Sequence, residues 1–430
     1  MKDREILKYC LDSFAEAGAD KSQVVLNRTK KYELNLEAGE ITLLRTTYNT
    51  DLSLTVIDHG KKGSITINKA DNESIDEAIK NAIELSKTSA VDDSYDISYE
   101  QEAKEFTSGD SEPDLDKMHS VLKEFVDSVK ELYPQIILNT VLEFKHNVRN
   151  FANSNGVNYK SSKGIYNVVL LFSSKEGEKS SSFNYSEISL KDLERELLHL
   201  GPTNYLLKQS VEQLNTTPIE GKFVGDVIIT PDCLKSTLEY YTNISVKDNA
   251  LISGTSLFKE KMNQQVASSK FTLHSNPVSE EVCNGYFITP DGFEAENLTI
   301  IEDGTLQSFL LSQYGAKKTK LERSKNTGGT YIVEAGDKGL QDIIKTVDRG
   351  IILSRYSGGI PSVNGDFSGV AKNSYYIENG EIKYPISETM VSGNLYDMFK
   401  NIEEISKERI NFGDAILPWI CSSGITISGK

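Results

Sequence analysis

Residues 358–393 read GGIPSVNGDFSGVAKNSYYIENGEIKYPISETMVSG, and this stretch carries the clearest local structural signals in the chain. Its second half predicts a β-hairpin, with Asn379-Gly380 as the turn between the apolar runs 375–377 and 382–385. Both central positions of such a tight turn need positive φ, which Asn and Gly adopt readily. Antiparallel β-structure is therefore expected near the C-terminus.

The first half of the stretch, residues 358–369, is a glycine-rich loop. Gly365 and Gly369 would let main-chain groups approach a ligand closely, where a Cβ would interfere. The other interpretation is a tight turn, in which Asp366 satisfies backbone groups and Phe367 fills the core. The candidate site residues are Asn364, Gly365, Asp366, Phe367, Ser368 and Gly369.

Upstream of this stretch, apolar periodicity predicts an N-terminal α+β domain over residues 1–90, with helices at 3–17 and 73–88. Between the helices, alternating residues predict an antiparallel meander with strands at 23–29, 32–37, 41–47, 52–58 and 64–68. Residues 91–113 are acidic and polar, and they predict a linker.

A middle α+β domain is expected over residues 114–215. Its predicted elements are a helix at 115–132, strands at 136–144 and 166–173, and a helical stretch from about residue 190, interrupted at Gly201-Pro202. The C-terminal domain, residues 216–430, is expected to be largely antiparallel β, with one helix from Pro231 to about Val246. Its predicted strands include 226–229, 270–273, 293–301, 306–312 and 415–428. The expected fold class is α+β.

Charge sets limits on the partners of this chain. Its 430 residues carry a formal net charge of −16. Non-specific binding to nucleic acid or to an anionic membrane needs a surface patch rich in Lys and Arg. The negative net charge therefore disfavours both kinds of binding. The one basic cluster is expected to be solvated surface: Lys317, Lys318, Lys320, Arg323 and Lys325.

The segment MKDREILKYCLDSF at the start of the sequence lacks the uninterrupted apolar core of a signal peptide. No window approaches the ~20 apolar residues of a membrane span. The four cysteines stand singly, without the spacing of a disulfide framework or a CxxC motif. A reduced, cytoplasmic protein is expected.

The run PSVNGDFSGVAKNSYYIENGEIKYPISETMVSGNL, residues 361–395, resembles the C-terminal signature of the TldD/PmbA family, once called modulators of DNA gyrase. The resemblance extends over most of the chain. Residues 290–305 resemble a strand–turn–strand region of that family, and 326–329 occupy the place of its Thr-Gly turn. Hairpin turns are the simplest interpretation of both.

One subunit type of this family carries HExxH on a helix of the third domain. Two His one turn apart bind zinc there, and the Glu acts as general base. The histidines of this chain include no pair at that spacing: His59, His119, His146, His199 and His274. The helix expected at 231–246 has no imidazole, Glu239 is the one carboxylate in its interior, and Cys233 is expected to be a core residue. Pairing His274 with Asp291 as acid and base is arbitrary at that separation, so a structural histidine is expected.

The chain therefore resembles the PmbA/TldE branch, whose members lack the zinc ligands. The resemblance implies a non-catalytic subunit of a cytoplasmic TldD/TldE-type metalloprotease assembly that acts on small or unfolded peptides. This chain is expected to bind no cofactor and to be inactive alone, with zinc held only by a TldD-like partner. The expected partners are that zinc-bearing subunit in a heterodimer, or a second copy in a homodimer, and an extended peptide. No membrane and no direct nucleic-acid contact are expected.

The same resemblance suggests that residues 364–369 line an internal channel at the subunit interface and contact a peptide there. Two alternatives stay open. The first is a homodimeric peptide-binding or assembly protein without a protease partner. The second is a regulator linked to DNA gyrase, which the net charge of −16 does not favour.

Overall fold

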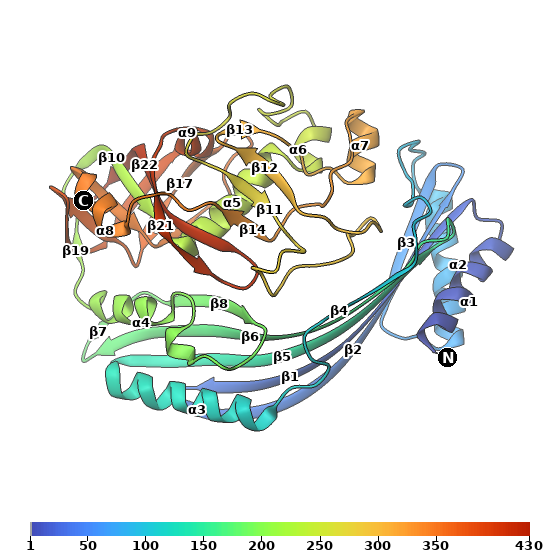
Figure 1. Ribbon diagram of the computed structural model, residues 1–430, viewed down its shortest axis with the longest axis horizontal. Coiled ribbons are helices and arrows are strands. Elements are labelled where there is room, and N and C mark those ends of the chain that lie inside the picture. The colour runs from blue at the N-terminus through green and yellow to red at the C-terminus, as the bar shows by residue number, and fades with distance from the viewer. Residues whose placement is uncertain (1) are drawn as a thin grey trace.

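The computed structural model describes residues 2–430 and consists of an N-terminal and a C-terminal lobe (Figure 1). The elements of the N-terminal lobe are α1 (Asp3–Glu16), β1 (Lys21–Glu37), β2 (Glu40–Asp58), β3 (Lys61–Ile67), α2 (Asn72–Thr88), β4 (Lys104–Ser108), α3 (Leu115–Leu132), β5 (Ile136–Asn153), β6 (Asn158–Glu176), β7 (Lys179–Ser180), β8 (Asn184–Leu190), a 3₁₀ turn (Leu197–His199) and α4 (Thr203–Glu212).

The C-terminal lobe follows directly from α4. Its elements are β9 (Thr217–Pro218), β10 (Lys222–Ile229), α5 (Pro231–Ser245), α6 (Asp248–Ile252), β11 (Leu273–Ser275), β12 (Leu298–Glu302), β13 (Thr305–Leu306), α7 (Gln313–Thr319), β14 (Tyr331–Val333), α8 (Leu340–Thr346), β15 (Arg349–Leu353), β16 (Arg355–Gly358), β17 (Asp366–Lys372), β18 (Tyr375–Glu378), β19 (Glu381–Ser387), β20 (Thr389–Asn394), α9 (Leu395–Lys400), β21 (Ile402–Asn411) and β22 (Ile416–Ser428). Helices and mixed, mostly antiparallel sheets confirm the α+β class.

One long curved sheet forms the N-terminal lobe and passes under the C-terminal lobe (Figure 1). Its strand order is β3-β2-β1-β5-β6-β4, and β7 and β8 also pair with β6. β1 pairs with β5 from Gln23↔Asn153 to Leu36↔Thr140. The strands expected in separate domains, 1–90 and 114–215, therefore lie in one sheet. The linker predicted at 91–113 contains β4, which pairs in parallel with β6.

Helices cover the two ends of this sheet, and each group of helices forms a separate hydrophobic core with it (Figure 1). α1 and α2 bury Ile6, Phe14 and Ile79 against one end. α3 and the 193–207 segment bury a second group, which includes Phe125 and Leu207, against the other. The long strands β1 and β5 contribute buried residues to both cores because they run the length of the sheet. The two hydrophobic cores explain why the sequence predicted two α+β domains, although the strands form one sheet.

Two-residue hairpin turns occur at three sites, and one of them is the predicted turn at Asn379-Gly380. Ala38-Gly39 joins β1 to β2, His59-Gly60 joins β2 to β3, and Asn379-Gly380 joins β18 to β19. All six residues have positive φ, between 49° and 80°. That is the backbone pattern a two-residue turn requires to match the twist of its strands.

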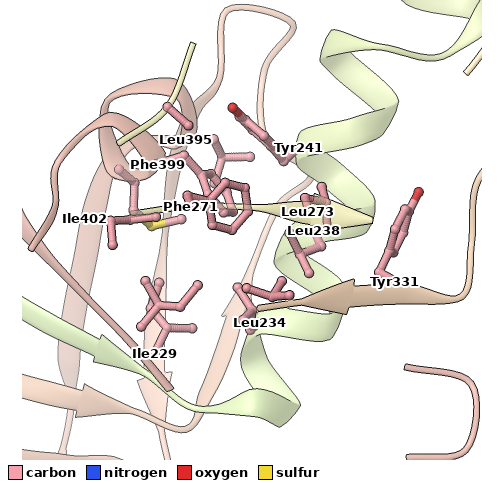
Figure 2. Packing of buried hydrophobic residues seen from close by; sticks show 14 of the residues in the cluster. Ile229, Leu234, Leu238, Tyr241, Phe271, Leu273, Tyr331, Leu395, Phe399 and Ile402 are labelled. Carbon is pink, nitrogen blue, oxygen red and sulfur yellow. The ribbon is translucent and has the colours of Figure 1, made fainter. Parts of the chain in front are cut away.

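The core of the C-terminal lobe is built around α5, shown with its apolar neighbours in Figure 2. Leu234, Leu238 and Tyr241 of α5 are buried, and Tyr241 stacks on Phe399 with 4.0 Å between ring centroids. β10 leads into the helix and pairs with β15 in parallel and with β22 in antiparallel register. The predicted helix and the predicted strands 226–229 and 415–428 are confirmed.

Several predicted strands of this lobe are wrong. Residues 307–312 form no strand, although Phe309, Leu310 and Leu311 are buried. Regular strand begins only at Leu298 within the predicted 293–301 segment and only at Leu273 near 270–273. In these segments apolar residues fill the core from irregular backbone, so an apolar run marks burial without marking a strand.

The helical stretch predicted from about residue 190 is also partly wrong. β8 continues to Leu190, and the helix α4 begins only at Thr203, after the predicted interruption. Between them, Asp192 accepts a hydrogen bond from the main-chain N–H of Glu194 at 3.1 Å. Such a local side-chain bond offers the backbone an alternative to helix. Within residues 2–430, no helix combines the length and the apolar character that a membrane span needs.

Candidate functional site

A cavity of about 300 Å³ lies between the two lobes, where the polar face of α5 meets β6 and β8 of the long sheet. Its walls are formed by Val169, Tyr185, Ser186, Glu187, Asp232, Cys233, Lys235, Ser236, Glu239, Arg355, Tyr356 and Phe412. The helix exposes this face because its opposite side is held in the core by Leu234 and Leu238. Residues one turn apart, Asp232 and Ser236, therefore point to the same cavity.

Asp232 and Arg355 are two of the ionisable residues that line this cavity. The Asp232 carboxylate accepts a hydrogen bond from Ser186 Oγ at 2.9 Å. Burial raises the pKa of Asp232, and the positive charge of Arg355 acts against that rise. The Arg355 guanidinium lies 3.6 Å from the centroid of the Tyr185 ring and donates from Nε to Asn184 Oδ1 at 2.6 Å. Two neighbouring residues of β8, in the N-terminal lobe, thus hold this arginine of the C-terminal lobe.

Polar groups without a protein partner remain at this site. Within residues 2–430, the buried Arg355 Nη2 and Tyr356 Oη atoms have no hydrogen-bond partner. The other two charged residues of α5 are engaged, because Lys235 pairs with Asp414 at 2.7 Å and Glu239 with Lys247 at 3.2 Å. Buried polar groups usually find partners. An unpaired guanidinium nitrogen and an unpaired hydroxyl therefore belong to two residues that line the cavity.

Two strand edges border the same cavity. Among the strands in residues 2–430, β8 pairs only with β6, and β16 pairs only with β17. β8 contributes Tyr185 to Glu187 to the walls, and β16 contributes Arg355 and Tyr356. An unpaired edge presents a row of main-chain N–H and C=O groups to a further strand. The cavity is thus suited to an extended chain.

The cavity is poorly equipped for covalent or metal-assisted hydrolysis. It has no imidazole, and burial raises the pKa of the Cys233 thiol to about 12, which keeps it in the unreactive thiol form. A zinc ion would need three or four N, S or O donors that converge. In residues 2–430, only Asp20, Asp58 and His59 bring three such donors within 4.8 Å of one another. The cavity residues do not fit zinc.

The Asp20, Asp58 and His59 group lies where the turn between β2 and β3 meets the residue before β1. Asp20 accepts the main-chain N–H of His59 at 2.7 Å, and Asp58 contacts the His59 ring at 2.7 Å. These hydrogen bonds account for the cluster as part of the turn.

The predicted site residues 364–369 do not line the cavity at α5. Gly365 has φ of +89°, and a Cβ on it would lie 2.7 Å from Tyr396 Cδ2. The glycine is therefore required by the close approach of the Tyr396 ring. The carboxylate of Asp366 accepts a hydrogen bond from the Asn394 side chain at 2.9 Å.

One residue of the loop nevertheless contacts a residue of the cavity wall. The Phe367 ring packs edge-on against Tyr356, with 5.8 Å between centroids, and Tyr356 lines the cavity. Asn364, Asp366 and Ser368 are exposed. Their place in a channel at a subunit interface stays a prediction.

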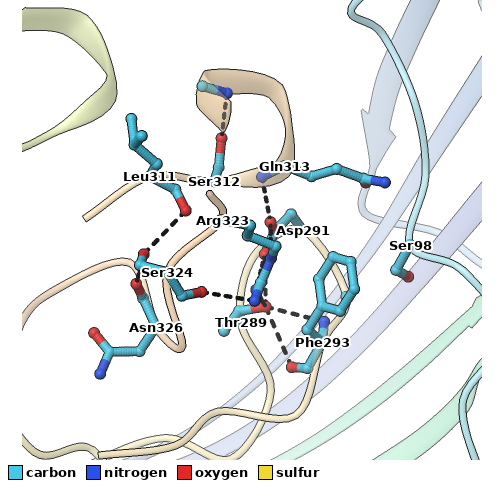
Figure 3. A network of polar contacts seen from close by, with 12 residues as sticks. Ser98, Thr289, Asp291, Phe293, Leu311, Ser312, Gln313, Arg323, Ser324 and Asn326 are labelled. Carbon is cyan, nitrogen blue, oxygen red and sulfur yellow. Dashed lines mark hydrogen bonds and ion pairs between the residues drawn. The ribbon is translucent and has the colours of Figure 1, made fainter. Parts of the chain in front are cut away.

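His274 and Asp291 do not form a pair. His274 contacts Thr299 Oγ1 at 3.0 Å and Glu334 at 3.1 Å. Asp291 is held by both the Nε and Nη2 atoms of Arg323, each at 3.0 Å (Figure 3). The expected structural role of His274 agrees with these contacts.

Most of the basic cluster predicted as solvated surface is exposed, and two of its lysines also pair with the other lobe. Lys317 pairs with Asp96, and Lys318 pairs with Asp92 at 2.7 Å. The acidic residues of the predicted linker and the two lysines of α7 are thus complementary. The acidic and the basic segment are far apart in the sequence, so their pairing could not be predicted from either segment alone.

The residues of the α5 cavity were also missed, although one signal was present. Asp232 and Ser236, four residues apart, stand on the polar side of a predicted helix. The contributions of Ser186 and Arg355 come from distant segments, and only the folded chain brings them to the helix.

Comparison with known proteins defines the class to which this two-lobed fold belongs. The model of the PmbA/TldA metallopeptidase C-terminal domain matches residues 221–429, and that of domain 1 matches residues 23–86. The chain belongs to the PmbA/TldD family.

Among individual proteins, the chain is 23% identical to "Metalloprotease PmbA" of Escherichia coli O157:H7, over 96% of this chain and 95% of that protein. The crystal structure of TldE from Thermococcus kodakarensis matches with a TM-score of 0.85 at 19% identity, covering 99% of this chain and all of the other. A proposed modulator of DNA gyrase from Bacteroides thetaiotaomicron matches with a TM-score of 0.88 at 20% identity, covering 100% and 99%. At these identities the two structures establish the fold.

Proposed function

We propose that this chain is a non-catalytic, PmbA/TldE-like subunit of a TldD/TldE-type peptidase assembly in the cytoplasm. The observation that carries the proposal is the polar face of α5. In the matched metallopeptidase domain, this helix presents Asp232, Lys235, Ser236 and Glu239 to an inter-lobe cavity, with no imidazole and with an unreactive thiol. A zinc-bearing, TldD-like subunit supplies the hydrolytic chemistry.

The role proposed for this chain is to hold an extended peptide. The free edge of β16 can pair with a peptide strand through main-chain hydrogen bonds, which accept many sequences. Arg355 Nη2 and Tyr356 Oη offer unpaired donors beside that edge. Small or unfolded peptides, with their main chain accessible, are the substrates that such a surface fits.

The proposal requires an association between subunits. The chain forms a heterodimer with the zinc-bearing relative, and it forms a homodimer when that relative is absent. Residues 364–369 lie close to the peptide path in the assembly, since Phe367 packs on Tyr356.

The test is reconstitution with an HExxH-bearing relative, followed by assay of peptide turnover. The chain alone is expected to be inactive, and the mixture active. Ser236→Trp, at an exposed position of α5 facing the cavity, is expected to reduce turnover at least about tenfold without loss of pairing. Ser120→Trp, also exposed but on α3, is the matched control and should retain wild-type turnover.

Chelator-sensitive hydrolysis by this chain without a partner would contradict the proposal. Full activity of the mixture that contains Ser236→Trp would show that the peptide does not pass through the α5 cavity.

A further inference from the structure

A second cavity between the lobes, of about 210 Å³, has an unusual charge for this acidic chain. Three basic side chains line it: Lys145, Arg149 and Lys163. No carboxylate lines it, whereas the whole chain has a net charge of −16. We propose that this cavity, which we term the cationic cavity, binds the oxyanion of a small ligand, a carboxylate or a phosphate.

The three cations are brought together by strand register. In β5 and β6, even-numbered residues such as Phe144 and Val168 face the core under α3, so odd-numbered residues face the C-terminal lobe. Asn147 lies opposite Lys163 in the antiparallel pair, two residues from Lys145 and from Arg149 on the same strand. All three positive charges therefore project from one face.

The C-terminal lobe closes the cavity with residues 284–288. Lys163 Nζ donates to Asn284 Oδ1 and to the Gly285 carbonyl, both at 2.6 Å. A Cβ on Gly285 would lie 1.8 Å from the Pro277 carbonyl oxygen, so only glycine permits this path of the segment. The loop is therefore held in a fixed position over the basic face.

Within residues 2–430, none of the three cations makes an ion pair. Glu143, the next residue on the same face of β5, is engaged by Lys31 at 3.5 Å and by Asn167 at 3.1 Å. The Nε atom of Arg149 is buried without a hydrogen-bond partner. Burial lowers the pKa of Arg149 and lowers that of Lys163 to about 8. An anion would pair with these charges and supply the missing acceptor.

The size and position of the cavity limit the ligand. Liquid water occupies roughly 30 Å³ per molecule, so the cationic cavity holds a carboxylate or phosphate group with a few attached atoms. Ile165 on β6 lines it, and Val169 on the same face of β6 lines the α5 cavity. From Lys163 to Val169 the strand spans about 20 Å, the length of roughly six extended residues.

Two sources of the oxyanion follow from this position. One is the terminal carboxylate of a peptide that crosses the α5 cavity, and this source rests on the proposed function. The other is inorganic phosphate, which does not depend on it.

The test is titration of the full chain, monitored by calorimetry, with three probes: inorganic phosphate, an N-acetylated alanine hexapeptide with a free C-terminus, and its C-terminal amide. One phosphate or one free-acid peptide per chain is expected to bind, and the amide is expected to bind at least about tenfold more weakly than the acid. Binding of the acid but not the amide identifies a peptide carboxylate, and binding of phosphate alone identifies the second source.

Variants locate the site. Arg149→Gln is expected to weaken the binding of the anion about tenfold or more, and Lys145→Gln, at an exposed position, about threefold or more. Lys160→Gln removes the same charge from the opposite face of β6 and should bind as wild type. Because Lys145 is exposed, its variant provides the test even where Arg149→Gln does not fold.

Absence of binding by phosphate and by the free-acid peptide would overturn the anion site, as would wild-type affinity in the Lys145 variant. Equal binding of the acid and the amide would contradict the anion site but leave the proposed peptide function intact. Binding of phosphate without peptide turnover in the presence of a partner would support the anion site and contradict the proposed function.

Discussion

Replacing Asp291 with Asn is expected to destabilise the C-terminal lobe strongly. The carboxylate accepts two hydrogen bonds from Arg323, one from the main-chain N–H of Gln313 at 2.8 Å and one from Thr289 Oγ1 at 2.6 Å (Figure 3). The Asp291 and Arg323 side chains are only 16% and 19% exposed. Removing one partner of such a pair leaves a poorly solvated charge, which costs about 3–5 kcal/mol.

Urea unfolding monitored by Trp419 fluorescence measures this effect, because the single tryptophan of the chain is buried in β22 of the same lobe. With a slope of about 2 kcal/mol per molar urea, the midpoint of unfolding should fall by about 2 M. Arg323→Gln alone should also destabilise the lobe. The double variant should cost less than the sum of the two single changes, since the two residues share one interaction.

The effect of Asp291→Asn should depend on pH. Burial alone would raise the pKa of Asp291, but the hydrogen bonds and charge of Arg323 outweigh it and hold the pKa below its usual value. A carboxyl with a depressed pKa stabilises the fold above its unfolded pKa, and this stabilisation is lost as the pH falls through the folded pKa. The difference between wild type and variant should therefore be constant near neutral pH and shrink below about pH 4. A midpoint shift under about 0.5 M at pH 7 would refute the reasoning.

Three further predictions concern single positions. Gly292→Ala should lower the unfolding free energy by more than about 2 kcal/mol in calorimetry, because Gly292 has φ of +83° and an added Cβ would lie 2.0 Å from Phe151; an unchanged melting temperature would contradict the close contact between lobes. Gly365→Val should likewise cost more than about 2 kcal/mol, since φ is +89° and Tyr396 occupies the space; full stability would mean that the loop is free to move. The Cys233 thiol, with its pKa raised by burial to about 12, should not react with a disulfide reagent at pH 8 until urea unfolds the chain, and rapid labelling of the native protein at this residue would show an accessible thiolate.

Local signals in the sequence predicted local structure well. The Asn379-Gly380 turn and the helix α5 need only their own residues, so both were predictable. The long strand β1 was divided in the prediction because Arg28 to Lys31 interrupt its apolar pattern. In the structure β2 and β5 pair with this polar middle on both sides, and those partners lie far along the chain.

The candidate site was less predictable for the same reason. Gly365 was recognised as a position that needs glycine, but the group that requires it, the Tyr396 ring, comes from α9. The α5 cavity combines Asp232 with Ser186 and Arg355, which are 46 and 123 residues away in the sequence. Single-chain periodicity describes the face of one element and does not reveal which faces meet.

The continuity of the long strands restricts how this protein can change in length. A residue inserted into the middle of β1 would move every later residue of that strand to the opposite side of the sheet, since side chains alternate with a period of two. Leu34 and Leu36 would leave the core under α3, while Val24 and Leu26 would stay in the core under α1 and α2. Insertions and deletions in these strands are therefore tolerable only in pairs of residues, or where a bulge restores the phase.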